Sequence, residues 1–146
     1  MHPAVISYLE ARKEHFYRIE STVSGKQFAT PRGWEDLARL IEVYAKSLGK
    51  DGLDREVTAQ YIENPRIAKD FAAYLELYYK YQSEYQIGAI LSGTVSESVI
   101  SRASRAAFDE RFSVVNLILS HLNGEFREAG KREEMISLLF GRLKEN

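Results

Sequence analysis

The residues best suited to chemistry stand at the start of one predicted helix, in the run Ala29-Thr30-Pro31-Arg32. Thr30 is a good helix N-cap, and Pro31 then takes the first helical position, where its missing N–H costs nothing. The apolar residues that follow recur every three or four positions, and Arg32 falls on the opposite side of the helix. The sequence therefore predicts a permanently charged guanidinium at a rigid helix start, directed away from the core. A solvated surface arginine is the more common interpretation of such a residue.

The rest of the chain carries no recognisable catalytic or metal-binding spacing. The histidines, at positions 2, 15 and 121, are far apart and lack the paired spacing of a metal site. No G-x-S-x-G segment supports a Ser-His-Asp hydrolase. Gly25-Lys26 could end a phosphate-binding loop, but that loop would need glycine and Ser or Thr where Glu20 and Gln27 stand. We therefore expect no metal site, and no hydrolysis of a triphosphate by this chain alone.

The run Ala29-Thr30-Pro31-Arg32 resembles the sensor 2 motif of AAA+ ATPases, in which a small residue, a proline and an arginine open a helix of the lid. The longer string Thr30-Pro31-Arg32-Gly33-Trp34-Glu35-Asp36-Leu37 is similar to the lid of the MoxR-type branch. His2-Pro3-Ala4-Val5 and the tyrosine-rich stretch 71–85 are similar too. The similarity covers about residues 2–90.

The resemblance implies that Arg32 reaches the γ-phosphate of ATP bound by an α/β core of the same subunit, with Thr30 and Pro31 beside the nucleotide. ATP and Mg²⁺ would be bound by the full-length protein and not by this piece alone. Hydrolysis would move the lid relative to the core in a homo-oligomeric ring, a hexamer by analogy. Members of this branch act with von Willebrand factor A domain proteins in chaperone-like remodelling. Since no phosphate-binding loop is present, either the piece is cut at the boundary between core and lid or the lid stands alone, and we expect the cut.

Length, charge and composition limit the other possibilities. The 146 residues fit one domain, or a small domain with an extension. The net charge of −1, from 20 basic and 21 acidic residues, gives no basic excess, so we expect no nucleic-acid partner. No apolar run approaches the ~18 residues that a membrane span needs. The absence of cysteine fits a reducing compartment, and we expect the protein in the cytoplasm.

The pattern of the N-terminal half predicts an all-α helical bundle with one irregular segment. We expect a first helix from Pro3 to about His15. The segment 16–29 contains the turn signal Ser24-Gly25 and fits either a small hairpin or a long ordered loop. A helix over 31–48 follows, ended by Gly49 and with Glu35 and Asp36 in its first turn. Its apolar stripe contains Trp34, Leu37, Ala38, Ile41, Tyr44, Ala45 and Leu48.

Two further helices complete the lid-like region 1–90. Asp54 is placed to cap a short helix that continues through Glu63. Asn64-Pro65 breaks this helix and starts a longer one, because the residue before proline avoids the helical region. Its apolar face contains Ile67, Ala68, Phe71, Ala72, Leu75, Tyr78 and Tyr79.

The remaining residues, 91–146, predict a C-terminal helical extension that packs on the lid-like region or flanks it. Thr94-Val95-Ser96-Glu97 has the form of a capping box. One helix or two could span 95–123, with Asp109 as the cap of a second one. Gly124 and Gly130 bracket a predicted loop or frayed turn before a last helix over 131–143. One side of the helix before this loop contains Phe112, Val115, Ile118, Leu119 and Leu122.

The competing hypothesis is a helical protein–protein interaction or dimerisation module with no nucleotide role. Its support is the amphipathic pattern of residues 94–143, which could form a dimer or partner surface. A helix-turn-helix around Gly49 to Asp54 is a weaker option, because neither of its helices is notably basic.

Overall fold

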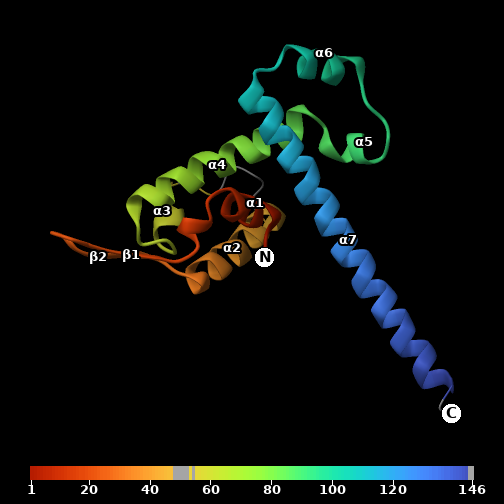
Figure 1. Ribbon diagram of the computed structural model, residues 1–146, viewed down its shortest axis with the longest axis horizontal. Helices are drawn as coiled ribbons and strands as arrows, with labels where there is room; N and C mark the ends of the chain where they lie inside the picture. Colours follow the sequence, from red (N-terminus) through yellow and green to blue (C-terminus); the bar gives the residue numbers. More distant parts are fainter. Residues whose placement is uncertain (48–52, 54, 145–146) are drawn as a thin grey trace.

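The computed structural model of the protein describes residues 1–47, 53 and 55–144, and the side chains of these residues up to 137. Over these residues the chain is mostly helical and contains a small two-stranded sheet. Figure 1 shows an N-terminal bundle with the sheet projecting from it, and a long C-terminal helix that extends away from the bundle. The structure therefore confirms a mostly helical fold, and the likeness to an AAA+ lid stays a prediction.

Helix α1 (Pro3–Ala11) is shorter than predicted and is followed by the 3₁₀ turn η1 (Lys13–His15). The imidazole of His2 caps its start, because Nδ1 accepts a hydrogen bond from the Ala4 N–H at 3.2 Å. The helix ends at Arg12, whose φ of −136° leaves the helical region. The Arg12 guanidinium pairs there with Asp70, at 2.8 Å. This partner is distant in sequence, and no local pattern signals it.

The segment that could be a hairpin or a loop is a hairpin. Strands β1 (Arg18–Thr22) and β2 (Gly25–Ala29) pair antiparallel, with Thr22 opposite Gly25. The two-residue turn places Gly25 at φ +121°, a conformation that glycine adopts without steric cost. Strand β2 then leads directly into Thr30 and the next helix.

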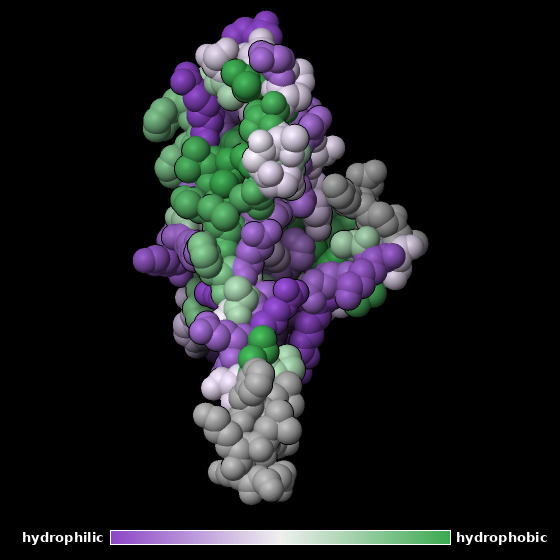
Figure 2. Space-filling model, turned by 90° about the vertical axis from the view of Figure 1, so that its right-hand side faces the viewer, coloured by the Kyte–Doolittle hydropathy of each residue, from purple (hydrophilic) through white to green (hydrophobic). Residues whose placement is uncertain are grey.

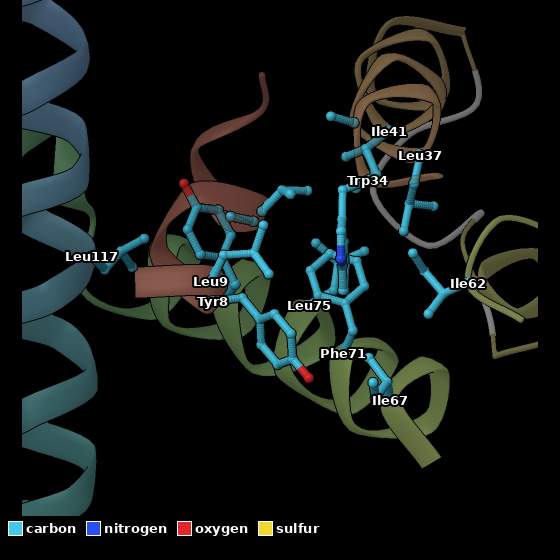
Figure 3. Close-up of a cluster of buried hydrophobic side chains, with 14 of the residues drawn as sticks. Tyr8, Leu9, Trp34, Leu37, Ile41, Ile62, Ile67, Phe71, Leu75 and Leu117 are labelled. Carbon is cyan, nitrogen blue, oxygen red and sulfur yellow. The ribbon is translucent and has the colours of Figure 1, made fainter. Parts of the chain in front are cut away.

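Helix α2 (Pro31–Ser47) buries the central part of its predicted stripe, namely Trp34, Leu37, Ala38 and Ile41. Farther along, Tyr44 is half-buried and Ala45 is exposed, so the stripe leaves the core before the helix ends. The predicted contacts of Leu48 and the predicted stop at Gly49 lie outside the described residues. Figure 3 shows the indole of Trp34 between α2 and the side chains of α1 and α4.

Helix α3 (Arg55–Ala59) ends before the predicted limit at Glu63. Its last turn closes when the Ile62 N–H bonds the Thr58 carbonyl, and the chain then extends to Asn64. The predicted cap Asp54 lies outside the described residues. Helix α4 (Pro65–Glu84) begins at the predicted proline, because the buried Asn64 side chain accepts the Ile67 N–H at 3.2 Å.

One short-range signal after α4 has an outcome that differs from the prediction. Helix α5 (Ile87–Leu91) follows α4 after Gln86, which is left-handed at φ 50°. Helix α6 (Glu97–Arg105) is capped by Ser96 and not by Thr94, so the predicted capping box is wrong. The Thr94 hydroxyl instead lies 3.0 Å from that of Ser92. Gly93, at φ +80°, turns the chain between the two helices.

Helix α7 (Phe108–Lys144) is separate from α6, so two helices and not one span residues 95–123. Ala106 adopts an extended conformation between them, and the carbonyl of Ala107 accepts the first helical bond from Arg111. Asp109 is therefore inside the helix and does not cap it. The predicted loop between Gly124 and Gly130 is wrong, since α7 continues through both. The intervening Glu, Arg and Ala residues are good helix formers, which offsets the cost of each glycine.

The predicted apolar side of this helix is only partly packed against the core, through Ile118. Val114 and Leu117 are buried, whereas Phe112, Val115 and Leu119 are more than half exposed. Helix α7 contacts α1, α4 and α5, and Val114 and Leu117 are its buried residues among the described side chains. Arg102 of α6 joins α4 to α7, because it pairs with Glu84 of α4 at 2.7 Å and with Glu110 of α7 at 3.1 Å.

Candidate functional site

The start of α2 is capped as the sequence predicts. The Thr30 hydroxyl accepts a hydrogen bond from the Gly33 N–H at 3.1 Å, and the Thr30 carbonyl accepts one from the Trp34 N–H at 3.1 Å. These bonds satisfy amide groups that a helix start otherwise leaves open. Pro31 follows as the first helical residue and is exposed. The cap therefore fixes the backbone on which Arg32 stands.

Gly33 contributes a packing constraint that the sequence analysis missed. A Cβ atom at this position would overlap the backbone carbonyl oxygen of Tyr61, in the segment between α3 and α4. Only glycine allows the helix start to approach that backbone so closely. A glycine inside a predicted helix start was the available signal, because glycine in a helix interior otherwise only destabilises it.

Trp34 holds the same helix start from inside the core. Its indole N–H donates to the His15 carbonyl at 2.9 Å, and the side chain is fully buried. The ring centroids of Tyr8 and Phe71 lie 5.6 and 5.2 Å from that of Trp34 (Figure 3). An indole that is both packed and hydrogen-bonded has one position available to it. The start of α2 is thus fixed to η1, α1 and α4.

Arg32 lies on the opposite, solvent side of this fixed helix start, where its side chain is 80% exposed. Its Nε donates to Asp36 Oδ2 at 3.0 Å, one helical turn farther along. This hydrogen bond raises the pKa of Arg32 further above its ordinary value, so the guanidinium is always charged. Glu35 and Asp36 are not in the first turn as predicted, since the turn of residues 31–34 contains no acid. They pair instead with arginines one turn away.

The three predicted site residues therefore differ in what they can offer a ligand. The Thr30 hydroxyl is occupied by its own helix, and Pro31 has no N–H to donate. Arg32 uses one of its five N–H groups on Asp36, and the others face solvent. The arrangement can bind an anionic oxygen with one charged, fork-shaped group and a helix N-terminus beside it.

A second polar cluster, between α1, η1 and α4, was not predicted. The Tyr8 hydroxyl donates to Asp70 Oδ2 at 2.9 Å and lies 2.7 Å from His15 Nδ1, while Arg12 pairs with the same carboxylate. Burial, then the hydrogen bond to Asp70, raise the pKa of Tyr8 far above its ordinary range. Because Asp70 is 62 residues from Tyr8, no spacing in the sequence could reveal the pair. This cluster holds α1 on α4.

An open groove of about 480 Å³ lies beside this cluster, next to the base of the hairpin. Its charged lining has both signs and consists of Arg18, Glu20, Arg66, Lys69 and Asp70. Glu20 receives hydrogen bonds from Arg18 and Asn64, which lower the pKa of its carboxyl group. The groove therefore pairs its own charges and offers no concentrated field of one sign.

The residues that the structure describes also bear on metal binding and on membrane spanning. In that part of the chain, no three side chains of His, Cys, Asp or Glu lie together as metal ligands would. Within the same part, no helix combines the length and apolarity needed to cross a membrane.

Comparison of this chain with known protein families, curated proteins and solved structures finds no match. The assignment of a function therefore depends on the resemblance carried by residues 29–37 and on the geometry at the start of α2.

Proposed function

We propose that the protein is the C-terminal lid region of a MoxR-type AAA+ ATPase, in which Arg32 serves as the sensor 2 arginine. The observation that supports this proposal is the exposure of Arg32 at a helix start that the cap, Gly33 and Trp34 hold in one position. A group that reports on a nucleotide needs both properties, because it must reach out of its own domain and still transmit what it contacts.

The donors of Arg32 suit a terminal phosphate. Nε is bonded to Asp36, and the exposed end of the guanidinium can form two parallel bonds to phosphate oxygens. Asp36 thus orients the fork without occupying all of it. Arg32 would distinguish ATP from ADP because only ATP has the γ-phosphate that the free end of the guanidinium would contact.

ATP and Mg²⁺ would be bound by an α/β core, which must supply the phosphate-binding loop that this chain lacks. ATP supplies the cleavable γ-phosphate. The contribution of this chain is the contact from Arg32, with Thr30 and Pro31 positioning the helix start beside the nucleotide. Because Arg32 would bond more strongly to one nucleotide state, hydrolysis changes the preferred orientation of the lid. A cytoplasmic homo-oligomeric ring, a hexamer by analogy, would use this motion for chaperone-like remodelling with a von Willebrand factor A domain protein.

Replacement of Arg32 in the polypeptide that joins this region to its core tests the proposal. We expect Arg32→Ala to lower ATP turnover by at least about tenfold, the size of effect that loss of a charged phosphate contact has. The melting temperature of the 146-residue chain should change little, because the Arg32–Asp36 pair is exposed. ATP hydrolysis and thermal melting are the two measurements.

Arg39→Ala is the matched control for this experiment. Arg39 is also exposed on α2 and pairs with an acid one turn away, Glu35 at 2.7 Å. It lies two turns from the helix start, so its removal should leave turnover unchanged. Equal turnover of the Arg32 variant and the unmodified protein, or equal losses in both variants, would contradict the proposal.

The second candidate function is a helical interaction module with no nucleotide role. The observation that favours it is the row of apolar side chains on α7 that the fold leaves largely exposed. A coding sequence without a phosphate-binding loop upstream of His2 would select this candidate over the lid.

A further inference from the structure

Helix α7 carries a row of apolar side chains along the surface that faces away from the bundle. We call this row the outer stripe. Five of its six members are more than half exposed, from Leu119 at 52% to Phe108 at 81%, and Leu122 is half-buried. Figure 2, which looks onto this side of the molecule, shows a band of hydrophobic side chains along it. The outer stripe consists of Phe108, Phe112, Val115, Leu119, Leu122 and Phe126.

The spacing of the outer stripe is that of a coiled coil. Its members follow one another at intervals of four, three, four, three and four residues. This is the heptad repeat in which the a and d positions of one helix insert between side chains of a second helix. In this register the a positions are 112, 119 and 126, and the d positions are 108, 115 and 122. A row of single exposed apolar residues without function would have no reason to keep this repeat.

The centre of the outer stripe lies across the helix from its buried residues. Among the described side chains of α7, Val114 and Leu117 are buried. Leu117 is two positions from both Val115 and Leu119, which corresponds to a rotation of about 200° around the helix axis. One edge of the stripe, at Phe112 and Leu119, borders a groove that α1 also lines. A second helix on the stripe would cover this groove and leave Val114 and Leu117 in their places.

We propose that the outer stripe binds the outer stripe of a second copy of this chain, as an antiparallel two-helix coiled coil. The two-fold axis passes at the height of Leu117. The six layers then pair Phe108 with Phe126, Phe112 with Leu122, and Val115 with Leu119, each pair occurring twice by symmetry. Every member of the stripe has an apolar neighbour in the second copy, and none extends beyond the overlap.

The charges that flank the stripe favour this antiparallel register. Arg111, at a g position, lies opposite Glu125 of the second copy, and the symmetry repeats this pair at the other end. At the e positions Asn116 meets its own copy and Asp109 meets Asn123, so no like charges face each other. The side chains of Arg111 and Glu125 are both exposed. Arg111 donates its Nε–H to the Ala106 carbonyl at 2.9 Å, and its terminal N–H groups can make the contact.

A parallel pair of the same helices has neither advantage. The g and e positions would then bring together Arg111 with Asn116 and Glu125 with Gly130, which leaves both charges without an opposite partner. Glu133 continues the a positions of the heptad, so a parallel pair would place it against its own copy. The antiparallel overlap ends at Phe126 and keeps Glu133 in solvent. The sequence thus selects one orientation of a second copy.

The oligomeric state of the 146-residue chain tests this proposal directly. Sedimentation equilibrium from about 1 to 500 µM should show a reversible monomer–dimer equilibrium. Leu119→Glu should raise the dimer dissociation constant more than about tenfold, because it places a charge in the central layers. Leu77→Glu is the matched control, since Leu77 is a leucine of α4 with 45% exposure, away from the stripe. It should leave the dissociation constant unchanged.

Charge exchange tests the register. Arg111→Glu and Glu125→Arg should each weaken the dimer by about 2- to 5-fold, because each creates like-charge pairs between copies. The double variant Arg111→Glu/Glu125→Arg should restore the original dissociation constant. If the double variant instead weakens the dimer by the combined effect of the two single variants, the antiparallel register is overturned.

Cysteine cross-linking tests the orientation, and the chain has no native cysteine to interfere. A mixture of Phe112→Cys and Leu122→Cys proteins should form the mixed disulfide dimer, because the two positions share a layer. Each variant alone should not, since positions 112 and 122 are about 15 Å apart along the helix. Disulfide dimers of the single variants in place of the mixed dimer would indicate a parallel pair and overturn the proposal.

A chain that stays monomeric over the whole concentration range would also overturn it, and the stripe would then belong to an unrelated partner or to another part of a longer protein. The inference names the partner for the second candidate function and does not depend on Arg32. Loss of the dimer in Leu119→Glu with ATP turnover intact would separate the two proposals, as would loss of turnover in Arg32→Ala with the dimer intact.

Discussion

Helices α2 and α7 carry apolar stripes of the same spacing, and the fold buries only the first of them. Trp34, Leu37 and Ile41 of α2 are fully enclosed, because α1 and α4 cover this side of the helix. Phe112 and Leu119 of α7 stay more than half exposed, although their spacing is as regular. The stripe predicts the helix in both regions. Which stripe becomes core is decided by the elements that pack against it.

The two regions also differ in how their backbones are held. The start of α2 is fixed by a side-chain cap, by the close approach of Gly33 to Tyr61 and by the indole bond of Trp34. In α7, a Cβ atom added at Gly124 or Gly130 would meet nothing within 4 Å. The start of α2 therefore cannot accommodate a side chain at Gly33, whereas α7 could accommodate one at Gly124 or Gly130. Matched substitutions in the two regions can test this difference.

The largest contrast should come from removing one aromatic ring in each region. Trp34→Ala should lower the free energy of unfolding by about 3–5 kcal/mol, because it leaves a cavity between α1, α2 and α4. Phe126→Ala should change it by less than about 0.5 kcal/mol, since this ring is 72% exposed. Urea unfolding of dilute protein, below the dimer dissociation constant, measures both. Similar losses in the two variants would show that α7 has a buried stripe after all.

The same unfolding experiment at high protein concentration sharpens the comparison. Phe126 would then be covered by Phe108 of a second copy, and Phe126→Ala should become destabilising. The effect of Trp34→Ala should not depend on concentration, because its neighbours belong to the same chain.

A smaller contrast should come from adding one methyl group in each region. Gly33→Ala should destabilise the protein by about 1–3 kcal/mol, since its Cβ would overlap a backbone atom that cannot move alone. Gly130→Ala should stabilise it by about 0.5–1 kcal/mol, because alanine is the better helix former and the site is open. Opposite shifts of the urea midpoint are the expected result. A destabilising Gly130→Ala would mean that α7 does not continue as a helix through this residue.

The parts of the fold that the sequence could predict are those fixed by neighbouring residues. The cap Thr30, the proline start at Pro65 and the hairpin turn at Ser24-Gly25 each act within three or four positions. Arg32 belongs to this group too, because its direction follows from the stripe of its own helix. Its exposure could therefore be predicted, although its bond to Asp36 was not.

The parts that could not be predicted depend on residues far apart in the sequence. Asp70 joins Tyr8 and Arg12, and Tyr61 excludes a side chain at position 33; neither contact leaves a local pattern. The sequence could not show how far the apolar side of α7 is covered, since its periodicity fits either a core face or a surface face. The predicted loop at Gly124 was wrong for a local reason. Glycine only lowers helix stability and does not end a helix by itself.

The smallest expected effect is the contribution of His2, the N-cap of α1, to the pH dependence of stability. Burial is the main cause that lowers the pKa of His2, against an opposing attraction from Glu42. As the pH falls through the ordinary histidine value of about 6.5, the unfolded chain takes up this proton before the folded one does, so stability decreases. Protonation at Nδ1 also removes the acceptor that caps Ala4.

His2→Ser should reduce this pH dependence and keep the start of α1 intact, because serine is a good N-cap without a titrating group. We expect the unmodified chain to lose more thermal stability than the variant between about pH 7 and pH 5. Melting temperatures of both proteins over this range provide the measurement. Parallel curves would mean that His2 titrates alike in the folded and unfolded chain. In that case burial of the imidazole would not disfavour its charged form in the folded chain, and the cap at the start of α1 would not depend on the protonation of His2.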